Sequence, residues 1–232
     1  MLALVGVLVL ALAGAVLWVA DDDVAWDRVA PEFWAAVTEL HTVRDLAGDG
    51  LVEGRDYAFM RTDEGRLLHW RCGRPIPVIL IGQAPQGVED LLSEATALLS
   101  ETSGLRLVPK HQPEGSRDVE GAITVLYGAL GGDAAETFTE ELGQGGPASG
   151  YNGLINFGEV TILTGPSQAP HTLPAENMEE ARAVLMHELA HTLGLDHSAT
   201  GAPGVMNPGL NPHDLALSPG DEFALRAVGC PR

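Results

Sequence analysis

The chain has 232 residues, which is enough for one ordinary domain with an appendage, and its formal net charge is −19. An acidic surface of this strength repels phosphate groups, which argues against nucleic acid or an anionic membrane surface as a partner. Acidity is also a common solubility property, so it identifies no function by itself.

The first twenty residues form an apolar leader without a charged side chain. As a helix they would span about 30 Å, the thickness of a bilayer core, which predicts an uncleaved membrane anchor through residues 1–20. A cleaved signal peptide is the alternative, with small residues at 13–15 as a cleavage site, although the usual basic start is missing. Both interpretations place the rest of the chain outside the cytoplasm, either membrane-anchored or secreted.

Residues 21–69 are predicted to be a linker or N-terminal extension. A short helix is expected at 31–40, where a proline occupies the first turn. Two short strands around a polar turn at 63–65 predict a hairpin within 57–70.

Residues 70–232 are predicted to form the main domain. An apolar, largely β-branched run at 76–81 is typical of a buried strand. Apolar residues then recur at helical spacing over 87–103, and Gly104 is suited to end that helix. Further strands are expected at 105–108, 122–127 and 158–164.

A long loop and two helices are expected in the second half of this domain. Residues 128–153 are rich in Gly, Asp and Glu and predict a long surface loop, whereas 176–193 predict a helix. A last helix is expected at 217–228, with Ser218 as its cap and Pro219 in its first turn. This order of elements suits an α+β, or mixed α/β, domain with a twisted sheet.

The helix expected at 176–193 carries the run of residues that is most informative about chemistry. His187 and His191 are four residues apart, so one helix face can present both imidazoles to one metal ion. Gly194 can adopt a left-handed conformation, end the helix and turn the chain so that His197 becomes a third ligand. Glu188 leaves the same turn and can take a proton from a water molecule there. Three protein ligands leave one position open, which indicates a catalytic zinc ion.

The run 187–197 fits the pattern H-E-x-x-H-x-x-G-x-x-H at every fixed position. With Ser198 after the third histidine, a turn at 204–208 containing Met206 and the helix at 217–228, it resembles the matrixin branch of the metzincin zinc proteases, including bacterial matrixins. The resemblance covers about residues 57–230. It implies a zinc-protease domain with a mostly parallel sheet, an active-site helix, a C-terminal helix, and Met206 packed beneath the metal.

The sequence also departs from that family. Residues 128–170 contain no histidine and His171 stands alone, so the second, structural zinc of animal matrixins is not expected. Pro208 stands where the astacin-like and serralysin-like branches have a tyrosine, which argues against those branches. A structural calcium ion could be held by acidic residues such as Asp133 and Glu136, but no recognisable loop spacing supports it.

The chain has two cysteines, Cys72 and Cys230. In an exported protein they predict a disulfide that links the start of the main domain to its C-terminal tail. Residues 71–75 also resemble the cysteine switch with which matrixin propeptides cap their own zinc. That interpretation is weaker because the first strand begins immediately afterwards and leaves no tether to cross the cleft. Free thiols are the third alternative.

The sequence therefore predicts a zinc-dependent endopeptidase that acts on a peptide or protein substrate, with Glu188 as general base. The substrate is expected to lie along an edge strand between 150 and 157. Two alternatives stay open: a catalytically inactive zinc-binding scaffold on a protease fold, and a zinc hydrolase of non-peptide amides. The sequence does not predict the oligomeric state.

Other candidate residues have simpler explanations. Asp196 is either a group that supports the metal ligands or an ordinary helix-end residue. Tryptophans 26, 34 and 70 are expected to anchor the N-terminal segment either to the domain or to the membrane surface. The remaining histidines lack metal-ligand spacing and are expected to bind no metal; they lie at positions 41, 69, 111, 171 and 213.

Overall fold

The computed structural model describes residues 50–128, 143–150, 152–163, 177–209 and 215–231. All of them belong to one compact unit, Leu46–Arg232. The predicted leader, the helix at 31–40 and the calcium ligands Asp133 and Glu136 lie outside the described residues. Among the helices that the structure does describe, none combines the length and the apolar character needed to cross a membrane.

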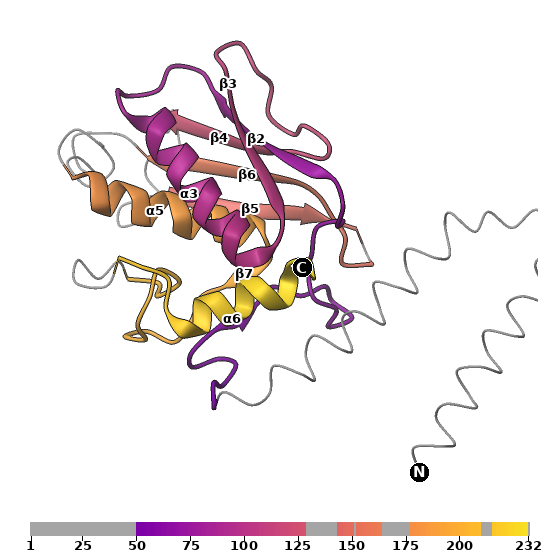
Figure 1. The fold of residues 1–232 in the computed structure, drawn as a ribbon. Coiled ribbons are helices and arrows are strands. Elements are labelled where there is room, and N and C mark those ends of the chain that lie inside the picture. The colour runs from indigo at the N-terminus through magenta and orange to yellow at the C-terminus, as the bar shows by residue number, and fades with distance from the viewer. Residues whose placement is uncertain (1–49, 129–142, 151, 164–176, 210–214, 232) are drawn as a thin grey trace, which may run out of the picture. The chain divides into compact units, whose positions relative to one another are not determined.

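A five-stranded sheet forms the centre of this unit (Figure 1). In spatial order its strands are β3 (Arg106–Gln112), β2 (Pro75–Ile81), β4 (Ile123–Gly128), β6 (Ile155–Leu163) and β5 (Gly143–Ser149). All neighbours pair in parallel except β5, which pairs antiparallel with β6. The protein is therefore a mixed α+β fold with a mostly parallel sheet, as the sequence predicts.

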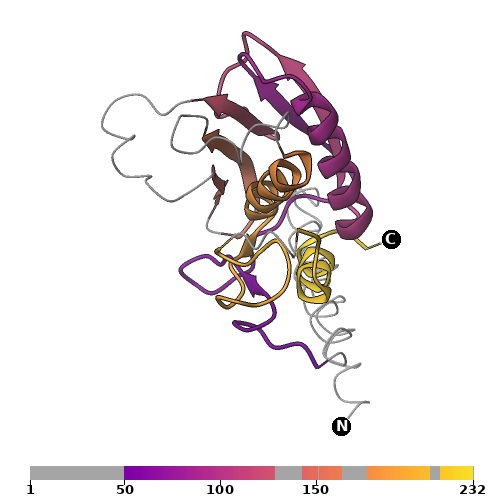
Figure 2. The ribbon, with the colours of Figure 1, turned by 90° about the vertical axis from the view of Figure 1, so that its left-hand side faces the viewer.

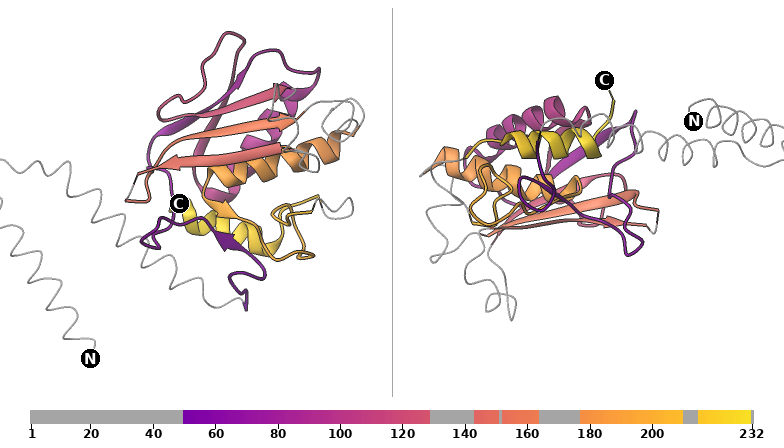
Figure 3. Two further views of the ribbon diagram at one scale, coloured as in Figure 1. Left: turned by 180° about the vertical axis from the view of Figure 1, so that it is seen from behind. Right: turned by 90° about the horizontal axis from the view of Figure 1, so that it is seen from below.

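Helices α3 (Val88–Ser103) and α5 (Met178–Thr192) lie on one face of the sheet (Figures 1 and 2). Figure 3 shows the opposite face from behind, where no helix of the described part covers the strands. Helix α6 (Pro219–Val228) packs against α3. Each of the three helices lies within one or two residues of its predicted position, because each has a clear apolar period or end signal.

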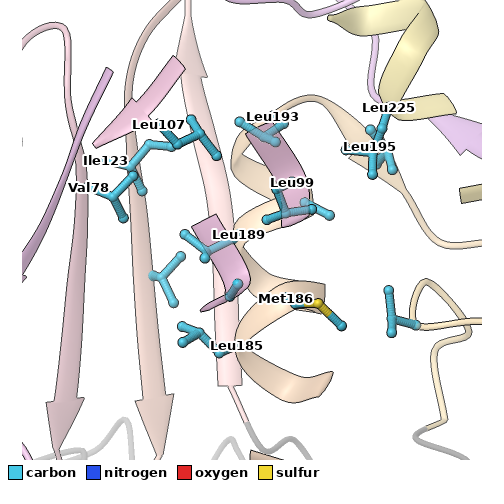
Figure 4. Packing of buried hydrophobic residues seen from close by; sticks show 14 of the residues in the cluster. Val78, Leu99, Leu107, Ile123, Leu185, Met186, Leu189, Leu193, Leu195 and Leu225 are labelled. Atoms are coloured by element: carbon cyan, nitrogen blue, oxygen red, sulfur yellow. The ribbon is translucent and has the colours of Figure 1, made fainter. Parts of the chain in front are cut away.

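The main hydrophobic core lies between the sheet and these helices. Leu185 and Leu189 of α5 and Leu193 at its C-terminal cap follow one another at intervals of four and are fully buried. They pack with Leu99 of α3 and with apolar strand residues such as Ile123 (Figure 4). Burying a leucine of this size stabilises a fold by about 1.5–3 kcal/mol, so α5 is firmly held on its apolar face.

The segment before the sheet is part of the same unit. Strand β1 (Ala58–Phe59) pairs antiparallel with β7 (Leu195–Asp196), which follows α5. The predicted turn is present, since the Gly65 N–H donates to the Thr62 carbonyl at 2.8 Å. The predicted hairpin is only partly formed, however, because the longest pairing of its first strand is with β7.

The structure corrects the prediction for the second half of the sheet. The expected loop at 128–153 is wrong for Gly143–Ser149, which forms β5. The expected edge strand between 150 and 157 is also wrong, because β6 lies inside the described sheet between β4 and β5. The edge strands are β5 on that side and β3 on the other. Glycine and proline have low strand propensity, so the conformation of β5 depends on its pairing with β6.

Cys72 and Cys230 form a disulfide with a Cα–Cα distance of 5.7 Å. It joins the chain just before β2 to the chain just after α6. In this state neither cysteine offers a thiolate, so the structure does not show the arrangement that a cysteine switch requires.

Candidate metal centre

Local signals in the sequence set both ends of α5. At the start, the Asn177 side chain accepts a hydrogen bond from the Glu180 N–H at 3.2 Å, and the first turn is acidic, which suits the helix dipole. At the end, Gly194 has φ +105°, which other residues rarely adopt. A Cβ at this position would also collide with the Leu68 carbonyl oxygen. Only glycine therefore fits where the chain turns towards His197.

The turn brings three imidazoles together. The Nε2 atoms of His187 and His191 are 3.0 Å apart, and each lies 3.1 Å from the Nε2 atom of His197. Three nitrogens on one tetrahedral zinc ion, with Zn–N bonds of about 2.0–2.1 Å, would be separated by about 3.3–3.4 Å. The observed spacing is within a few tenths of an ångström of that value. These three histidines therefore lie close enough to bind a metal ion.

Hydrogen bonds orient two of these rings. The Nδ1 atom of His187 contacts the Val205 carbonyl oxygen, and that of His191 lies 2.9 Å from the Leu195 carbonyl oxygen. A carbonyl oxygen can only accept, so Nδ1 carries the proton in both rings and the Nε2 lone pair faces the other imidazoles. This is the tautomer that a metal ligand needs.

Electrostatics favour the neutral form of the same rings. Burial, followed by the neighbouring His191, lowers the pKa of His187 to about 3. Burial also lowers the pKa of His191. At neutral pH the lone pairs of their two Nε2 atoms face one another with no proton between them, and they repel. A cation bound among the three histidines would remove this repulsion, so the donor set fits a metal ion.

Glu188 follows His187 on α5 and its side chain is buried, with 6% of its surface exposed. It lies beneath strand β5: a Cβ built on Gly143 would be 2.8 Å from the Glu188 Oε1 atom. The predicted base is thus next to the histidine cluster in sequence and is covered by the edge strand of the sheet.

The turn at 204–208 supports the cluster from the other side. Met206 is buried, and its carbonyl oxygen accepts a hydrogen bond from the Ser198 N–H at 2.9 Å. The Val205 N–H donates to the Asp221 carboxylate at 3.1 Å, while the Val205 carbonyl contacts His187. The turn therefore connects the third-ligand loop, the first ligand and helix α6.

Asp221 is a supporting residue that the sequence analysis did not identify. Its carboxylate also accepts from the Ser218 N–H at 2.8 Å, and Ser218 in turn caps the Asp221 N–H at 3.1 Å. Burial raises the pKa of Asp221 to about 6, although the hydrogen bonds from Ser218, Val205 and Met206 oppose that shift. The Ser-x-x-Asp spacing at 218–221 is the signal that could have revealed this capping box.

Trp70 and Asp196 have roles more specific than predicted. The Trp70 indole N–H donates to the Thr192 carbonyl oxygen at 2.9 Å, which satisfies a backbone acceptor at the end of α5. Asp196 accepts a hydrogen bond from the His197 backbone N–H at 2.7 Å. Both contacts hold the chain that leads to the third imidazole.

Two other histidines are described, and neither joins the cluster. His69 lies 3.3 Å from the Trp70 carbonyl oxygen, and His111 contacts Glu89 at 2.9 Å. The histidines at positions 41, 171 and 213 lie outside the described residues.

Comparison with known proteins adds no family assignment. No model of a known protein family matches the chain. No curated protein matches it significantly either. Any function must therefore be argued from the residues and their geometry.

Proposed function

We propose that this protein is a zinc-dependent endopeptidase of the matrixin-like metzincin type. The observation that carries the proposal is the convergence of three Nε2 atoms from His187, His191 and His197, with Glu188 adjacent to the first of them. The resemblance in sequence and the mostly parallel sheet with a helix bearing two ligands are consistent with it.

Zinc is the metal that best suits three imidazole ligands with one open position. When bound, zinc would polarise the scissile carbonyl and lower the pKa of a water molecule to about 7. The carbonyl groups of Val205 and Leu195 would assist the binding of such an ion, because they hold His187 and His191 in the ligating tautomer.

Glu188 is the proposed general base. Its carboxylate takes a proton from the attacking water as the water oxygen bonds to the scissile carbonyl carbon. It then gives that proton to the leaving amine nitrogen as the carbon–nitrogen bond breaks. The carboxylate is buried beneath β5, and this restricted environment favours a fixed position for such a group.

Strand β5 is the proposed site for the substrate chain. It is an edge of the sheet and lies over α5 at Glu188, so an extended peptide paired with β5 would run past the proposed base. This replaces the segment at 150–157 as the expected substrate strand. The apolar leader at 1–20 supports the further expectation that cleavage takes place outside the cytoplasm.

Digestion of a peptide library with zinc-loaded protein tests the proposal. We expect cleavage that a chelator abolishes and added zinc restores, and that His191→Ala lacks. His69→Ala is the matched control, because this histidine lies outside the cluster, and it should cleave normally. Zinc-loaded protein that cleaves no peptide would contradict the proposal and favour a scaffold or a hydrolase of other amides.

A further inference from the structure

Strand β5 has an unusual composition for an edge strand, with glycine at three of its seven positions, Gly143, Gly145 and Gly146. None of the three has a positive φ angle, so none is needed for backbone conformation. The space around each Cα atom is therefore the feature that can require glycine at these positions.

Gly143 lies directly against the Glu188 side chain. A Cβ added here would be 2.8 Å from the Glu188 Oε1 atom, 2.9 Å from Cγ and 3.0 Å from Cδ. Such separations are closer than real Cβ atoms adopt, so alanine at 143 would displace the carboxylate. The Gly143 Cα atom thus forms part of the wall that limits where this carboxylate can lie.

Gly145 lies against the backbone of the same residue. A Cβ here would be 2.8 Å from the Glu188 carbonyl carbon and 2.9 Å from its Cα atom, and closer still to its carbonyl oxygen. A helix backbone cannot move aside as a side chain can, so alanine at 145 would push β5 away from α5. By contrast, a Cβ on Gly146 would meet nothing within 4 Å.

We propose that Gly143 and Gly145 are positioning residues for Glu188. The missing side chain at 145 allows β5 to lie on the helix at this residue, and the missing side chain at 143 then leaves only enough room for the carboxylate in one place. Strand β5 thereby forms the edge that would pair with the substrate and also fixes the position of the base beneath it. The proposal rests on the proposed peptidase function, but its packing can be tested separately.

A double-mutant cycle on thermal stability tests the packing without any activity. Gly143→Ala should lower Tm by about 2–12 °C, the range expected for overpacking in a chain of this length. In a Glu188→Ala background that loss should largely disappear, because the clashing atoms are gone. Gly145→Ala should lose a similar amount in both backgrounds, because the backbone of residue 188 remains.

Gly146→Ala is the matched control on the same strand. It causes the same loss of entropy in the unfolded chain and its Cβ meets no atom, so its Tm should equal that of the parent protein or exceed it by up to about 4 °C. If Gly143→Ala alone fails to fold, recovery of the fold in the double variant with Glu188→Ala supports the proposal. An equal loss for Gly143→Ala in both backgrounds overturns it.

Steady-state kinetics test the positioning of the base. Gly143→Ala should bind one zinc ion, lower kcat by about tenfold to a hundredfold with KM nearly unchanged, and shift the acidic limb of the pH profile of kcat/KM. His69→Ala, which lies outside the histidine cluster, should show neither change. Unchanged kcat and pH profile in Gly143→Ala would overturn the proposal. A parent protein that cleaves no peptide contradicts the proposed function instead, and the stability cycle still decides whether the glycines position Glu188.

Discussion

The buried carboxylate of Asp221 should make stability depend on pH in a direction opposite to that of most acidic residues. Its pKa is raised to about 6 in the folded protein, against 3.8 for the unperturbed group, and the largest cause is burial. The folded state therefore binds this proton more tightly than the unfolded state does. Protonation of Asp221 should stabilise the fold as the pH falls from above 6 towards 4.

The size of the effect follows from the two pKa values. The full difference corresponds to about 3 kcal/mol, and about 1 kcal/mol of it should appear between pH 7 and pH 5. Urea unfolding of the parent protein and of Asp221→Asn, both with a chelator, would measure it. The difference in unfolding free energy between the two should change by about 1 kcal/mol in favour of the parent as the pH is lowered from 7 to 5.

Comparing these two proteins removes the contribution of the histidines, which has the opposite sign. The lowered pKa values of His187 and His191 destabilise the metal-free fold as the pH falls below about 6.5, but they do so in both proteins. A difference between parent and Asp221→Asn that is independent of pH would refute the argument that Asp221 is held in a desolvated site.

Three further predictions concern the contacts around the site. Replacing Cys72 and Cys230 by serine should lower the unfolding free energy by up to about 5 kcal/mol, because their separation of 158 residues closes a long loop; a loss under about 1 kcal/mol in denaturant titration would contradict this. Trp70→Phe should lower the unfolding free energy by about 1–3 kcal/mol in the same assay, because the Thr192 carbonyl loses its hydrogen-bond donor. An unchanged denaturation midpoint would count against that contact. Removing zinc with a chelator should lower the Tm of the parent protein by about 8–16 °C. The chelator should have no effect on the Tm of His191→Ala and the full effect on that of His69→Ala. No Tm change in the parent protein would argue against a bound metal.

The helices and the histidine cluster could be predicted because their signals are local. Helix α3 has a clear apolar period and ends at Gly104, and α6 begins at a serine cap. The spacing of His187 and His191 and the glycine at 194 are enough to predict that His197 approaches the same point.

The capping box of Ser218 and Asp221 was missed although its spacing is local, whereas the other missed features depend on contacts between separate parts of the chain. Strand β5 reads as a loop because its glycines have low strand propensity, yet the same glycines allow it to lie against α5. The hydrogen bond from Trp70 to Thr192 spans 122 positions, and no local pattern indicates it. Only the pairing of β5 with β6 reveals which strand is the edge.

The isosteric variant Glu188→Gln tests whether Glu188 is the general base. The metal content and the peptidase kcat of this variant should be measured on the same preparation. We expect one zinc ion per chain, as in the parent protein, and a loss of about 10²–10⁴-fold in kcat, because the amide cannot accept the water proton. A variant that retains its zinc and cleaves peptides at the parent rate would show that Glu188 is not the general base.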